Sequence, residues 1–121
     1  LLPVVRELLL EQQFHRALEA IWEVVGAANR YVDEQAPWTL RKTDPPRMAT
    51  VLYVLAETIR RLALMTQPFM PQASGKILDQ LGVPDERRGF ADLGDGSALV
   101  AGTPLPKPEG VFPRHLDPAA A

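Results

Sequence analysis

The stretch from Phe14 to Gln35 has the spacing of an amphipathic α-helix, and a proline follows directly after it. Charged side chains lie opposite an apolar stripe that recurs at every third or fourth position, made up of Phe14, Leu18, Ile21, Val25, Ala28 and Val32. Pro37 has no backbone N–H and keeps Ala36 out of the right-handed helical region, so the helix is predicted to end there. A stripe of this length must be covered by neighbouring elements, which favours an all-α fold.

Three other stretches have helical periodicity. The first covers Val4–Gln12, and a short turn should separate it from the long helix. Asp44 followed by two prolines is typical of a helix start and predicts a helix over Pro46–Thr66, with Asp44 as its N-cap. A shorter helix is expected over Gln72–Leu81, with Gly82 just beyond its end. We therefore expect an antiparallel bundle of about four helices, with the third helix at its centre.

The composition changes after residue 82. Residues 83–121 contain five of the eight glycines and six of the twelve prolines. Such punctuation predicts an irregular C-terminal tail that packs back on the bundle through a few short apolar patches. We accordingly divide the chain into a helical bundle over residues 1–82 and an irregular segment over residues 83–121. The chain begins at Leu1 rather than Met, and we expect it to be a fragment of a longer protein.

Several kinds of chemistry are excluded or disfavoured by composition. The chain has no Cys, which excludes disulfides, a thiol nucleophile and Cys-ligated metals, and its two histidines, His15 and His115, lie far apart in sequence. No catalytic constellation or phosphate-binding loop is present. A net charge of -2 disfavours a broad basic surface, and no apolar run approaches the roughly 20 residues of a membrane span. We expect a cytoplasmic, non-catalytic domain without cofactor, metal, membrane or DNA.

The residues around the end of the long helix are the candidates for binding. Trp38 comes directly after Pro37, in a segment that we expect to be a non-helical connection extending to Thr43. Asn29 and Asp33 lie one turn apart on the same margin of the preceding helix. A flat aromatic ring beside an amide and a carboxylate has the chemistry to stack on, and hydrogen-bond to, a planar ligand.

Two interpretations of this region remain open from the residues alone. Arg41 and Lys42 add positive charge beside Trp38, as in surfaces that bind single-stranded or loop RNA, and are candidate phosphate contacts. Alternatively, Trp38 plugs the end of the core in a helical protein-interaction or scaffold domain. Exposure of the Trp38 ring distinguishes the two, because an exposed ring favours RNA. Glu57 with Arg60 or Arg61 is expected to form only an ordinary surface pair.

The run from Ala28 to Trp38 closely resembles the anticodon-binding domain of methionyl-tRNA synthetases. In that family a helix ends in the pattern Asn-Arg-Tyr-(Val/Ile)-(Asp/Glu)-x-x-x-Pro-Trp. Later matches follow in the same order, first the residues 68–71 with Ile77–Gly82, and then the closing segment from Leu105 to Arg114. Together these matches cover most of residues 14–115.

The resemblance implies a helical bundle attached to a catalytic domain, with tRNA as partner. The family reads the CAU anticodon of methionine tRNAs. By resemblance, Trp38 stacks on an anticodon base, and Pro37 holds it by ending the helix. Asn29 and Asp33 are implied to help accept the correct anticodon and reject others. The parent protein would be an ATP-dependent methionine–tRNA ligase.

The chain also departs from the family pattern. Two further anticodon readers of the family, an Asn and an Arg on the first helix of the bundle, have no counterpart, because this chain is expected to begin after that helix. The HIGH and KMSKS signatures are absent, so the catalytic domain that binds ATP and methionine must lie elsewhere in the parent. No OB domain follows Ala121, which would imply a monomeric parent if the chain naturally ends there.

Overall fold

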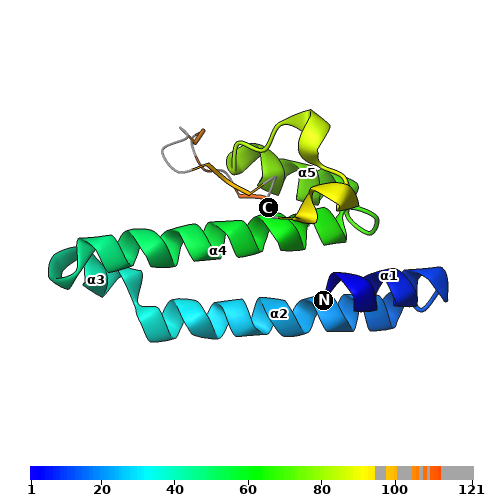
Figure 1. Cartoon of the computed structure of the whole chain (residues 1–121), viewed down its shortest axis with the longest axis horizontal. Coiled ribbons are helices and arrows are strands. Elements are labelled where there is room, and N and C mark those ends of the chain that lie inside the picture. The colour runs from blue at the N-terminus through cyan, green and yellow to red at the C-terminus, as the bar shows by residue number, and fades with distance from the viewer. Residues whose placement is uncertain (95–97, 101–104, 107, 109, 113–121) are drawn as a thin grey trace, which may run out of the picture.

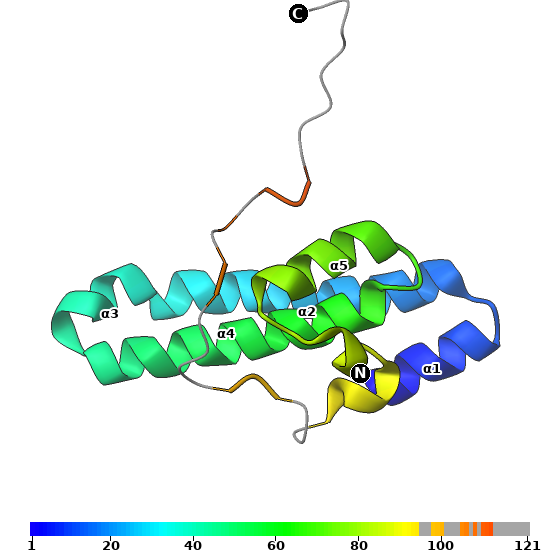
Figure 2. The same ribbon diagram turned by 90° about the horizontal axis from the view of Figure 1, so that it is seen from above.

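Two long antiparallel helices form a hairpin in the computed structural model, and the shorter helices pack around it (Figures 1 and 2). The structure describes residues 1–94, 98–100, 105–106, 108 and 110–112. Within these ranges there are five α-helices and no strand, which confirms the predicted all-α class. They are α1 (Leu2–Leu10), α2 (Phe14–Gln35), α3 (Pro37–Thr43), α4 (Pro45–Thr66) and α5 (Pro71–Gln80), followed by the 3-10 helices η1 (Asp85–Arg87) and η2 (Phe90–Leu93).

The predicted start and stop signals are confirmed at α4 and α5. The Asp44 side chain accepts a hydrogen bond from the Arg47 backbone N–H at 3.2 Å, as an N-cap does, and prolines occupy the first turn of α4. Gly82, with φ of 71°, takes the left-handed conformation just after the C-cap of α5. Local residue chemistry therefore sets these boundaries to within one residue of the prediction.

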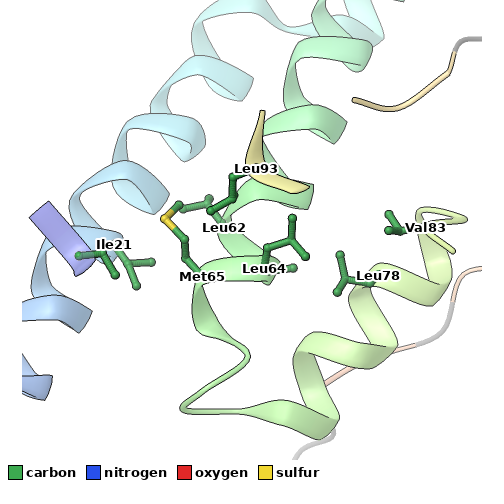
Figure 3. Packing of buried hydrophobic residues seen from close by; sticks show 9 residues of the cluster. Ile21, Leu62, Leu64, Met65, Leu78, Val83 and Leu93 are labelled. Carbon is green, nitrogen blue, oxygen red and sulfur yellow. The ribbon is translucent and has the colours of Figure 1, made fainter. Parts of the chain in front are cut away.

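The central position of α4 is also confirmed, since it packs against α2, α3, α5 and η2. Figure 1 shows α2 along one side of α4 and α5 along the other. The buried cluster joins side chains of α1, α2, α4 and α5 to two residues beyond α5, and it consists of Val5, Ile21, Leu62, Ala63, Leu64, Met65, Leu78, Val83 and Leu93 (Figure 3). Val83 and Leu93 thus place parts of the segment after residue 82 in the same core as the helices.

The prediction that Arg60 forms an ordinary surface pair with Glu57 is not confirmed, because the Arg60 side chain is 0% exposed. Its Nε donates to the Glu57 carboxylate, and its Nη1 donates to the backbone carbonyl of Asp92 at 2.7 Å. The other Glu57 oxygen accepts a hydrogen bond from the Leu99 backbone N–H at 3.0 Å. The prediction was wrong because the segment after η1 covers this side of α4, which helical spacing alone does not reveal.

The C-terminal residues of the sequence resemblance are described only in part. Leu105, Pro108 and Phe112 are exposed. Pro113 and Arg114, which complete the last matching run, lie outside the described residues, as does His115.

Candidate nucleic-acid interface

A short helix, α3, lies at the tip of the hairpin formed by α2 and α4 (Figure 1), and Trp38 belongs to it. The sequence predicted a non-helical connection from Trp38 to Thr43, and that prediction is wrong. Pro37 occupies the first helical position, where its missing N–H costs nothing and its fixed φ suits a helix. Ala36 leaves the right-handed helical region as predicted, with φ of 44° and ψ of 65°. The proline that ends α2 therefore also begins α3.

Trp38 is the second residue of α3 and is 61% exposed, whereas the adjacent Pro37 is buried. The buried proline anchors the start of α3 and the indole ring faces solvent. A tryptophan that plugged the end of the core would show the opposite pattern. The exposure of Trp38 therefore favours a stacking surface over a packing corner.

Asn29 and Asp33 lie one turn apart on the last turns of α2, and both are exposed. Within the described part of the chain, no side-chain hydrogen bond or ion pair holds either group. Their amide and carboxylate are consequently free to bind a ligand at the end of the helix that leads into Trp38.

Arg41 and Lys42 lie in the last turn of α3 and are exposed. Cations at this position also interact favourably with the negative end of the helix dipole, so a structural reason for them exists as well. Their location on the same short helix as Trp38 nevertheless places two cations close to the exposed ring.

One contact of this region had no signal in the sequence. The Arg47 side chain, at the start of α4, donates from Nη2 to Oε1 of Gln35 at the end of α2, at 2.8 Å. The two residues are 12 positions apart. Only the antiparallel pairing of α2 with α4 brings them together.

The conformation of Ala36 leads to a prediction about stability. A left-handed alanine costs about 1 kcal/mol, whereas glycine adopts this conformation without a Cβ clash but gains entropy when unfolded. We expect Ala36→Gly to raise the free energy of unfolding by about 0.5 kcal/mol and Ala36→Val to lower it by about 1 kcal/mol or more. Urea unfolding of the chain measures both, and a valine variant as stable as the glycine variant would contradict the prediction.

Two further kinds of site find no support among the described residues. No group of three or more His, Asp or Glu side chains that could hold a metal ion occurs there. None of the helices in those ranges is both long and apolar enough to cross a bilayer.

The fold and the surface together define a class of protein. An all-α hairpin that presents an exposed tryptophan, flanked by amide, carboxylate and cationic groups, has the chemistry of a domain that binds unpaired RNA bases. Residues 6–120 match the family model of the anticodon-binding domain of methionyl-tRNA ligase. The chain belongs to this family.

Individual relatives agree with the family match. The chain is 53% identical over 120 residues to the methionine–tRNA ligase of Rhizobium meliloti, and the match covers 99% of the chain and 23% of that protein. It is 50% identical over 111 residues to the corresponding ligase of Mycobacterium tuberculosis. The crystal structure of the apo form of methionyl-tRNA synthetase from M. tuberculosis superposes with a TM-score of 0.90 at 47% identity, covering 97% of the chain and 24% of that structure. The chain spans about a quarter of the length of these relatives.

The family match confirms the predicted resemblance, but it does not test individual residues. The roles assigned to Trp38, Pro37, Asn29 and Asp33 stay predictions, as does phosphate binding at Arg41 and Lys42. The structure adds that all of these except Pro37 are exposed.

Proposed function

We propose that this domain binds the anticodon loop of methionine tRNA and reads the CAU anticodon for a methionine–tRNA ligase. The exposure of Trp38 at the tip of the hairpin, in a chain of this family, is the observation that carries the proposal. The parent enzyme joins methionine to tRNA with ATP in the cytoplasm. ATP and methionine bind in the catalytic domain of the parent enzyme. That catalytic domain is, after tRNA, the second partner of the anticodon-binding domain, which itself needs no cofactor.

Stacking on Trp38 supplies a contact that an unpaired base of any identity can make. An indole ring stacked on a base contributes about 1–3 kcal/mol, judged by alanine substitution. The ring is already exposed and its helix is anchored by the buried Pro37, so little reorganisation accompanies binding.

Asn29 and Asp33 supply the discrimination between bases. The Asp33 carboxylate only accepts hydrogen bonds, so it favours a base edge that presents donors, such as the exocyclic amine of cytosine or adenine, over an edge that presents only carbonyl oxygens. The Asn29 amide both donates and accepts, and it therefore suits a base edge with mixed groups. Rejection arises because a wrong base leaves a polar group without a partner.

Arg41 and Lys42 supply charge near the backbone of the anticodon loop. They contact phosphates and so fix the position of the loop without reading its sequence. Their contribution weakens as salt concentration rises, because counterions compete for the same phosphates.

Replacing Asp33 with asparagine in the full-length ligase tests the proposed discrimination. The variant keeps the size of the side chain and exchanges one acceptor for a donor, so the preference for CAU over single-base variants should fall about tenfold. The preference is measured as the ratio of kcat/KM for a tRNA transcript with the CAU anticodon to kcat/KM for a transcript in which one anticodon base is changed.

Glu34→Gln is the matched control, since it removes a charge from the adjacent exposed residue on another side of α2. It should leave the preference unchanged. An equal loss of preference in both variants would indicate a general effect of charge and would contradict a role for Asp33 in reading bases.

A further inference from the structure

The orientation of Trp38 depends on how α3 is held, because α3 is too short to be stable alone. It has seven residues, and helices below about 12 residues are marginal in water. Pro37 is its only buried residue. Since α3 packs on α4, the relative placement of α2 and α4 at the tip of the hairpin determines where the indole ring points.

One side-chain hydrogen bond joins the two long helices at that tip. The hydrogen bond from Arg47 Nη2 to Gln35 Oε1, at 2.8 Å, links the last residue of α2 to the first turn of α4. In the part of the chain that the structure describes, no other side-chain hydrogen bond connects α2 with α4. The contact closes a loop that contains all of α3.

The position of Arg47 is unfavourable for α4 itself. A cation in the first turn of a helix lies at the positive end of the helix dipole, where an acidic residue is preferred. Asp44 already caps this end through the Arg47 backbone N–H. The described hydrogen bond of the Arg47 guanidinium is therefore not local to α4: its partner is the half-buried Gln35 on the other helix.

We infer that Gln35 and Arg47 form a clamp that sets the position of α3 and thereby aims Trp38 at the anticodon base. This inference rests on the proposed function. Both are positioning residues: they act on tRNA binding through Trp38 rather than by touching RNA. Direct binding of a phosphate by Arg47 is the competing explanation, and it assigns no role to Gln35.

A double-mutant cycle in the full-length ligase separates the two explanations. Gln35→Ala and Arg47→Ala should each raise KM for methionine tRNA about fivefold, the effect of one charged hydrogen bond, with kcat and ATP–methionine exchange nearly unchanged. The double variant should also show about a fivefold increase, because both substitutions break the same contact. Gln35→Glu keeps the acceptor oxygen and should restore a KM close to that of the unmodified enzyme.

Thr50→Ala, one turn further along the exposed side of α4, is the control and should leave KM unchanged. A normal KM in Gln35→Ala together with a raised KM in Arg47→Ala would overturn the clamp in favour of a phosphate contact. The clamp would also be overturned if KM in the double variant rose by the product of the two single-variant increases. Trp38→Ala, measured in parallel, tests the proposed function separately. A raised KM in Trp38→Ala together with a normal KM in Gln35→Ala rejects only the clamp. A normal KM in Trp38→Ala rejects the proposed function.

Discussion

Trp38→Ala in the full-length ligase is expected to lower kcat/KM for methionine tRNA about 100-fold, the upper end of the effect of losing one stacked base. The ring is exposed, so its removal leaves the core of the domain intact. ATP–methionine exchange should stay unchanged, because that reaction needs no tRNA. Aminoacylation kinetics with varied tRNA, alongside exchange kinetics, measure the two effects separately.

Two variants sharpen the interpretation of this result. Trp38→Phe keeps an aromatic face of smaller area and should give an intermediate loss. Thr39→Ala alters the next exposed residue of α3 and should leave both activities unchanged. A parallel loss of aminoacylation and exchange in Trp38→Ala would instead assign the tryptophan a role in folding.

Arg60→Ala should lower the free energy of unfolding by about 3 kcal/mol, as expected when one partner of a buried ion pair is removed. The Glu57 side chain is only 13% exposed and would lose the guanidinium that neutralises it. The Asp92 carbonyl would lose its hydrogen-bond donor at the same time. Urea unfolding of the chain measures the change, which should appear as a lower midpoint.

Arg61→Ala is the matched control for Arg60. Its Nε lies 3.7 Å from the same Glu57 carboxylate, but its side chain is 41% exposed. Solvent screening should hold its loss below about 1 kcal/mol. Equal losses in the two variants would contradict the conclusion that burial makes Arg60 the essential partner.

Local chemistry explains which parts of the fold the sequence predicts. The bounds of α2, α4 and α5 follow from apolar period, capping residues and prolines, all of which act within a few positions. The character of α3 does not follow in this way, since Pro37 is compatible with both a helix end and a helix start. In the structure Ala36 adopts a left-handed conformation, which ends α2 and allows α3 to begin at Pro37. An alanine side chain does not predict this conformation.

Contacts between distant segments explain what the sequence does not predict. The burial of Arg60 depends on the position of η2. Arg88 also makes contacts that depend on tertiary structure, since it donates to the carbonyls of Val83 and Gly75 and to the Asp79 carboxylate. At the site, helical spacing was enough to place Asn29 and Asp33 on one margin of α2. The exposure of Trp38 and the bond between Gln35 and Arg47 required the tertiary arrangement of the hairpin.

Stacking of Trp38 on an anticodon base is tested most directly by a fluorescent base inside the anticodon loop. Methionine tRNA carrying 2-aminopurine at one anticodon position should lose fluorescence on binding the full-length ligase, because stacking on indole quenches the base. The Trp38→Ala enzyme, at concentrations that saturate the tRNA, should leave the fluorescence nearly unquenched. Equal quenching by the two enzymes at every anticodon position would contradict the stacking role of Trp38.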